Sequence, residues 1–82
     1  MHSKISLDSN VFKALSAKSR VDILKHLNHR KYTQSELSQL MNIKVPSVKE
    51  HLNELEKAEL VKKLDEGRKW KYYELTYKAK SL

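Results

Sequence analysis

The sequence predicts a mainly helical α+β domain that ends in a small β-hairpin. Apolar residues recur at helical spacing in four stretches before residue 58, and two stretches rich in strand formers then flank a Gly-containing turn at 66–68. A chain of 82 residues has material for only one compact core. We therefore expect a single domain across residues 1–82. Its expected order is helix, helix, short extended segment, helix, helix, strand, strand and a final turn of helix.

Two helices are expected in the first third of the chain. Ser9 or Asp8 can cap the first helix, and the second begins near Ser19. Their apolar edges consist of Val11, Phe12 and Leu15 in the first helix, and Ile23, Leu24 and Leu27 in the second. A short extended segment at residues 31–32 should follow.

A pair of helices joined by a tight turn is expected over residues 33–58. Thr33 can cap the first of them, and Glu36 three residues later completes a capping box. Asn42 tolerates the left-handed conformation that ends a helix sharply. Pro46 suits a first helical turn, where its missing amide would have no partner, so the second helix begins near Val45.

The helix pair has an apolar face and a polar face. We expect the core to receive Leu37, Leu40 and Met41 from the first helix, and Val45, Val48, Leu52 and Leu55 from the second. The opposite face of the second helix carries Pro46, Ser47, Glu50, Asn53 and Glu54, with Lys49 and His51 at its flanks. These polar residues are the candidates to enter a groove of nucleic acid.

The charge distribution indicates where a polyanion would be held. The chain has a net charge of +7 and a pI near 9.7, which favours polyanionic partners. Residues 33–59 nevertheless carry three lysines against five glutamates, so the helix pair is not itself basic. We infer that phosphate attraction comes from the N-terminal third and from the hairpin, while the second helix of the pair contacts base edges.

The hairpin over residues 60–75 is basic at its tip. Arg68 and Lys69 could enter a minor groove or grip phosphates, and Lys62 and Lys71 could reach the backbone. The alternative is that these charges only keep the hairpin soluble and discourage edge pairing. Among the aromatic residues, Tyr73 shares a strand face with Leu75 and should be core. For Trp70 and Tyr72, cross-strand packing and a partner-facing surface remain open.

A helix pair followed by a basic hairpin is the pattern of a winged helix-turn-helix made to sit on duplex DNA. The helix-turn-helix would span about residues 33–58 and the wing about residues 60–75. The candidate DNA contacts are Thr33, Gln34, Lys44, Pro46, Ser47, Lys49, Glu50, His51, Asn53, Lys62, Arg68, Lys69 and Lys71.

Three segments in the right order resemble the ArsR family of winged-helix repressors. Residues 14–27 resemble the family's opening signature, residues 36–61 its helix-turn-helix and residues 67–76 its wing. The resemblance implies a prokaryotic transcription regulator, often a homodimer, whose second helix of the pair reads the major groove while the wing holds the flank. Because the segment after Thr76 is shorter than the dimer helix of many relatives, we expect dimer contacts at Val11, Phe12, Leu15, Tyr77 and Leu82.

The sequence departs from the family at several positions. Many relatives sense metals through two cysteines on the first helix of the pair, but this chain has no cysteine, which excludes thiolate-bound metal. His26 and His29 alone would make a weak metal site, so we expect no metal and no other cofactor. Glu50 stands where relatives usually carry Arg, and Glu59 replaces the Gly that usually closes the second helix.

Other function classes are weighed against DNA binding. We expect no enzymatic activity, because no carboxylate or oxyanion loop accompanies Ser47 and His51. No apolar run could span a membrane and no signal peptide is expected, which predicts a cytoplasmic protein. The alternatives to duplex DNA binding are a protein-interaction module whose basic face meets an acidic partner, and an RNA-binding module. Salt dependence of DNA binding separates the first alternative from the main hypothesis.

Overall fold

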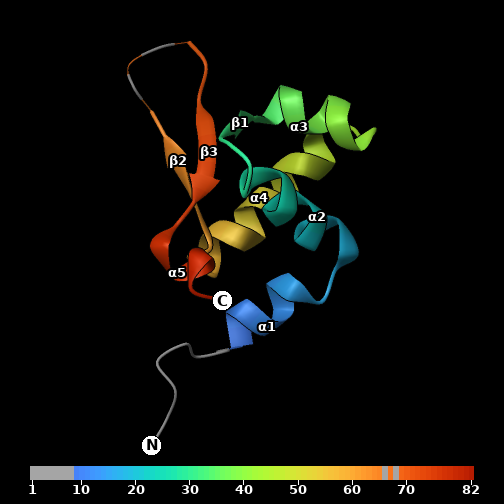
Figure 1. Ribbon diagram of the computed structural model, residues 1–82. Coiled ribbons are helices and arrows are strands. Elements are labelled where there is room, and N and C mark those ends of the chain that lie inside the picture. Colours follow the sequence, from blue (N-terminus) through green and yellow to red (C-terminus); the bar gives the residue numbers. More distant parts are fainter. Residues whose placement is uncertain (1–8, 66, 68) are drawn as a thin grey trace, which may run out of the picture.

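The computed structural model describes residues 9–65, 67 and 69–82, and it confirms the predicted fold class and element order (Figure 1). The elements are α1 (Ser9–Leu15), α2 (Lys18–Leu27), β1 (Tyr32–Thr33), α3 (Gln34–Met41), α4 (Val45–Lys57), β2 (Val61–Leu64), β3 (Tyr72–Leu75) and α5 (Tyr77–Lys80). The first expected cap, Asp8, lies outside the described residues, and Ser9 is the first residue of α1.

The sheet has three antiparallel strands in the order β1-β3-β2. Tyr73 of β3 lies opposite Tyr32 on one side and Lys63 on the other, and Val61 lies opposite Leu75. We call β2, β3 and the turn between them, residues 61–75, the wing, which projects beyond the helices in Figure 1. Gly67 in the turn has a positive φ of 74°, which glycine adopts without a steric penalty.

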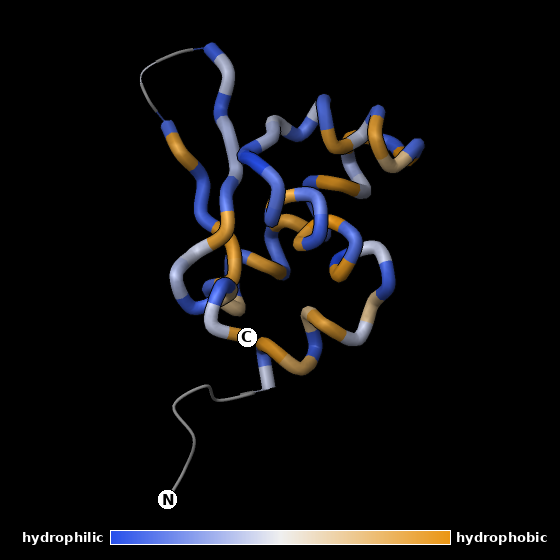
Figure 2. Tube along the Cα trace, viewed as in Figure 1, coloured by the Kyte–Doolittle hydropathy of each residue, from blue (hydrophilic) through white to orange (hydrophobic). Residues whose placement is uncertain are grey.

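Helix α4 lies at the centre of the domain and packs against α1, α2, α3 and β2. Its residues Val48, Leu52 and Leu55 have no exposed surface, in agreement with the sequence prediction. They meet Leu37 of α3 and Ile23 of α2 in one core. Figure 2 shows apolar stretches of the helices gathered around the middle of the domain, whereas the segment leading into β3 is mostly hydrophilic. The core therefore fixes which face of α4 points outward.

The predicted ends of the helix pair are confirmed. The Glu36 amide donates to the Thr33 hydroxyl at 3.1 Å, and the Thr33 amide donates to the Glu36 carboxylate at 2.9 Å, which completes the capping box. That backbone hydrogen bond from Thr33, with Arg30 nearby, lowers the pKa of Glu36. Asn42 ends α3 in the left-handed conformation at φ 56°, and α4 begins at Val45 with Pro46 in its first turn.

Two residues of the predicted apolar stripe are not in the core. Leu40 is 50% exposed and Val45 is 38% exposed. Both lie where α3 ends and α4 begins, at the side of the helix pair that is remote from the sheet in Figure 1. The helical spacing of apolar residues placed Leu40 and Val45 on the apolar face of the helix pair. The core, however, does not reach the end of the pair where α3 meets α4.

Glu59 takes the backbone conformation that a glycine would adopt after α4. Its φ is 62°, and the Leu60 amide reaches back to the Leu55 carbonyl at 2.9 Å, as in a glycine-ended helix. Residues near α5 hold this turn, because the Thr76 hydroxyl donates to the Glu59 carbonyl at 2.7 Å and the Lys78 ammonium to the Ala58 carbonyl at 3.1 Å. The strained conformation is thus fixed by the surrounding structure.

We expect Glu59→Gly to raise the free energy of unfolding by roughly 0.5–1 kcal/mol. Relief of the left-handed strain, about 1–2 kcal/mol, outweighs the extra freedom that glycine gives the unfolded chain. Urea denaturation of both proteins measures the difference. Asn42→Gly is the matched control, since Asn already tolerates φ 56° and should gain less. A loss of stability in the Glu59 variant would contradict the assignment of strain to this residue.

Candidate nucleic-acid interface

The outward face of α4 is formed by the polar residues that the sequence predicted. Pro46, Ser47, Lys49, Glu50 and Asn53 are all exposed. Lys44, the residue before α4, is also exposed, and its side chain makes no capping hydrogen bond. The buried residues Val48, Leu52 and Leu55 hold this face away from the core, so α4 presents a continuous polar surface along one side.

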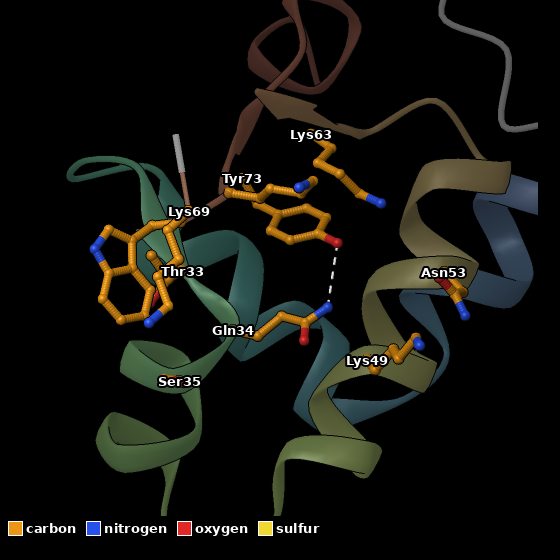
Figure 3. A pocket seen from close by; sticks show the side chains of 10 residues that line it. Thr33, Gln34, Ser35, Lys49, Asn53, Lys63, Lys69 and Tyr73 are labelled. Carbon is orange, nitrogen blue, oxygen red and sulfur yellow. Dashed lines mark hydrogen bonds between the residues drawn. The ribbon is translucent and has the colours of Figure 1, made fainter. Parts of the chain in front are cut away.

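The wing and this face of α4 border the same hollow. Figure 3 shows the hollow, a pocket of about 290 Å³ between the start of α3, α4 and the wing. We call it the lysine pocket, because four lysines contribute to its lining. The lining residues are Thr33, Gln34, Ser35, Lys49, Asn53, Lys63, Lys69, Trp70, Lys71 and Tyr73. The predicted contact at Arg68 lies outside the described residues.

Lys62 and Lys63 occupy opposite faces of β2. Lys63 lies opposite Tyr73 and lines the lysine pocket, with its Nζ 5.9 Å from the centre of the Tyr73 ring. Lys62 lies opposite Glu74 on the other face and pairs with that carboxylate at 3.5 Å. The sequence-based choice fell on Lys62, whereas the lysine of β2 that lines the pocket is Lys63. The register of β2 against β3 decides this, because it places Lys63 opposite Tyr73 and therefore on the same face of the sheet.

Thr33 and Gln34 lie at the pocket but are partly engaged within the fold. The Thr33 hydroxyl accepts the capping hydrogen bond of α3. The Gln34 amide nitrogen donates to the Tyr73 hydroxyl at 3.2 Å, a bond drawn as a dashed line in Figure 3. Gln34 thereby joins the first turn of α3 to the central strand of the sheet. Its side-chain oxygen is the group left to meet a ligand.

The aromatic residues of the wing have different surroundings. Trp70 is 57% exposed, lines the lysine pocket and has the Lys69 Nζ 5.4 Å from its ring centre. Tyr72 is half-buried, and the Lys31 Nζ lies 4.9 Å from its ring centre. Tyr73 is buried, as predicted. Trp70 is therefore largely exposed and Tyr72 is largely packed within the fold, while contact of Trp70 with a partner stays a prediction.

His51 faces α2 rather than the groove side of α4. It is half-buried, and its Nδ1 accepts a hydrogen bond from Arg20 Nε at 3.2 Å. Burial, with Arg20 as a further cause, lowers the pKa of His51, so the ring favours its neutral form with the proton on Nε2. His51 thus packs toward α2 within the chain, and the DNA contact expected at this residue stays a prediction. Arg20, which sequence reasoning did not single out, holds His51 in place.

Glu54 is also removed from the predicted groove face. Its carboxylate pairs with Lys57 at 3.2 Å and with Lys13 of α1 at 3.8 Å. The hydrogen bond from Lys57, followed by the charge of Lys13, lowers its pKa. Glu54 therefore lies on the α1 side of α4, which leaves Glu50 as the acidic residue of the outward face.

The predicted dimer residues divide into buried and exposed ones. Val11 has no exposed surface, because it belongs to the core of its own chain, so its assignment to a dimer surface is corrected. Phe12, Tyr77 and Leu82 are 68%, 86% and 48% exposed. Leu15 is half-buried and, together with Leu82, lines an apolar pocket of about 300 Å³ between α2 and α5.

The described residues form neither a metal centre nor a membrane-spanning helix. Within residues 9–65, 67 and 69–82, no three His, Cys, Asp or Glu side chains gather to hold a metal ion. His26 packs edge-on against Tyr32 with ring centres 6.3 Å apart. No helix in this part of the chain is long and apolar enough to cross a membrane.

Comparison with known proteins identifies the family. The signature of bacterial regulatory proteins of the arsR family matches residues 17–63. The chain belongs to the ArsR family. Over 67 residues it is 37% identical to the transcriptional repressor SdpR of Bacillus subtilis (strain 168), a match that covers 82% of this chain and 73% of SdpR. The resemblance seen in the sequence is confirmed.

Solved structures of other regulators share the fold of this ArsR-family chain. The transcriptional regulator HlyU of Vibrio vulnificus CMCP6 is 25% identical with a TM-score of 0.77, and the match covers 88% of this chain and 75% of HlyU. The transcriptional repressor BigR of Xylella fastidiosa is also 25% identical with a TM-score of 0.77, and the match covers 89% of this chain and 73% of BigR. The family and these relatives are regulators of transcription, and this chain is an ArsR-family transcriptional regulator.

Proposed function

We propose that this chain binds duplex DNA sequence-specifically as a transcription regulator in the cytoplasm of a prokaryote. In this proposal α4 enters the major groove and the wing contacts the flanking backbone or minor groove. The observation that carries it is the shared hollow: the exposed face of α4 and the lysines of the wing border the same pocket. SdpR and BigR are both named as transcriptional repressors, and we propose that this chain also represses transcription.

The dimensions and chemistry of α4 suit a major groove. With 13 residues it is about 20 Å long, and a major groove about 12 Å wide admits one α-helix. Asn53 offers the amide that can pair with an adenine edge, and Glu50 can accept a hydrogen bond from a cytosine amino group. Lysines at the pocket would hold the phosphates on either side.

We further propose that the regulator acts as a homodimer. Exposed Phe12, Tyr77 and Leu82 and the apolar pocket beside Leu15 give α1, α2 and α5 a surface that a second copy could cover. A dimer would set two α4 helices against half-sites about one helical turn, roughly 34–36 Å, apart.

Selection of bound fragments from random duplexes tests the proposed function. We expect enrichment of a sequence with two-fold symmetry and half-sites about 10 base pairs apart. Failure to enrich any duplex, together with binding to an acidic protein partner, would favour the interaction module instead. Enrichment of single-stranded RNA in a parallel selection would favour the RNA-binding alternative, which the exposure of Trp70 among lysines supports.

Changes on α4 and on the wing should differ in their effect on sequence preference. We expect Asn53→Ala to alter preference at one or two base pairs by roughly 1–3 kcal/mol, because it removes a base-edge contact. Glu50→Gln should do the same at a neighbouring position. Lys69→Ala, by contrast, should weaken binding to all duplexes alike, since phosphate contacts carry no base information. Fluorescence anisotropy with a set of single-base variants of the selected site measures both effects. Uniform loss in all three proteins would count against α4 as the helix that reads bases.

A further inference from the structure

We propose that the lysine pocket is a discrete phosphate-binding site in which Lys63 of the wing and Lys49 of α4 act together. Lys49 and Lys63 reach the pocket from two elements that are separate in the sequence, as Figure 3 shows. Lys69 and Lys71 are the other two lysines in the lining of the pocket.

The charges around the pocket are only partly balanced by the protein itself. None of the described lining residues is acidic. Within the described part of the chain, neither Lys49 nor Lys63 forms an ion pair with a carboxylate, whereas Lys71 has Asp65 at 3.6 Å. Several ammonium groups around one hollow repel each other, and an anion bound among them removes that repulsion. The pocket is therefore suited to an anion.

The uncharged polar residues in the lining of the pocket favour phosphate over a simple halide ion. A phosphate group has several strong acceptor oxygens, which can take hydrogen bonds from ammonium, amide and hydroxyl donors at once. The pocket offers such donors in Asn53 and Ser35 beside the lysines. A volume of about 290 Å³ has room for a phosphate or a pyrophosphate.

The phosphate can come from two sources with the same chemistry. One is the duplex backbone, and in that form the inference rests on the proposed function. The other is a free phosphorylated small molecule, which would then compete with DNA for the wing. Binding of a free phosphate does not depend on DNA binding, so the two proposals can fail separately.

The test compares two neighbouring lysines of the same strand. Lys63→Gln removes a pocket charge, and Lys62→Gln removes an equal charge from the opposite face, where Lys62 pairs with Glu74. Lys63→Arg keeps the charge and serves as the rescue variant. Thermal melting confirms that all three variants fold. Each full-length variant is then titrated with pyrophosphate at constant ionic strength, followed by amide NMR shifts, and with the selected duplex over a series of salt concentrations.

We expect Lys63→Gln to weaken pyrophosphate binding about tenfold and Lys63→Arg to restore most of it. Lys62→Gln should have little effect. For duplex DNA, Lys63→Gln should lower the slope of log affinity against log salt by about 1, as expected for one lost phosphate contact. If Lys63→Gln changes only the binding of duplex DNA, the pocket holds a phosphate of the DNA backbone. If it changes only the binding of pyrophosphate, the pocket holds a free phosphorylated ligand.

Equal behaviour of Lys62→Gln and Lys63→Gln in both titrations would overturn the inference while leaving DNA binding intact. If the unaltered protein binds no duplex but its binding of pyrophosphate requires Lys63, the proposed function fails and the phosphate site stands.

Discussion

Leu52→Ala is expected to lower the free energy of unfolding by about 2–5 kcal/mol. Leu52 has no exposed surface and lies in the middle of α4, where it belongs to the core shared by the helices and the sheet. Truncation removes buried apolar surface and leaves a cavity that the neighbouring side chains fill only in part. Small domains are stable by about 5–15 kcal/mol in total, so this change removes a large part of the stability.

Urea denaturation followed by circular dichroism measures the effect of Leu52→Ala. The matched control is Leu40→Ala, the same substitution on the neighbouring helix at a residue that is 50% exposed. It should cost less than about 1 kcal/mol, since the side chain is already half in solvent. Similar losses in the two variants would contradict the position of the core under α4.

Affinity for the selected duplex is expected to fall on the order of 10³-fold between 50 and 200 mM salt. The estimate assumes that about six phosphates are neutralised, which gives a slope of log affinity against log salt of about −5. The lysine pocket, which has four lysines in its lining, is the surface that we expect to make this contact. Apart from Lys49, the outward face of α4 adds little positive charge, because its exposed residues Ser47, Glu50 and Asn53 are neutral or acidic.

Anisotropy titrations at several salt concentrations measure this dependence. A non-specific duplex of equal length is the control, and its slope should be of similar size because phosphate contacts are independent of sequence. A duplex affinity that stays constant over the range would contradict the proposed function and favour the protein-interaction module.

Local chemistry made much of the fold predictable. The capping box of Thr33 and Glu36, the left-handed Asn42 and the early Pro46 each act within a few residues, and the structure has all of them where the sequence indicated. The buried face of α4 also follows from spacing alone, because a periodic apolar stripe can pack in only one way.

Long-range packing decided the features that the sequence did not reveal. Leu40 continues the apolar stripe of its helix, yet among the described residues no other element covers that end of the helix pair. Val11 lies on the same short helix as exposed Phe12, and only the docking of α1 onto α4 separates their environments. The contact of His51 with Arg20 spans 31 positions in the sequence, beyond the reach of any local pattern.

The lysine pocket was partly predictable. Lys49, Asn53, Lys69 and Lys71 were all candidates before the structure was known, and the pocket brings them together. Lys63 was missed because the face of β2 depends on its register against β3. Once that register is known, Lys63 shares the face of Tyr73 and lines the pocket beside α4, while Lys62 lies on the opposite face.

Arg20 joins three helices through one side chain. Its Nε donates to His51 of α4, and its Nη1 donates to the carbonyl of Lys13 in the last turn of α1, both at 3.2 Å. A tilt of α1 relative to α4 must stretch one of these bonds. The orientation of α4, the helix proposed to enter a groove, therefore depends on the position of α1. Helix α1 is the one that carries exposed Phe12.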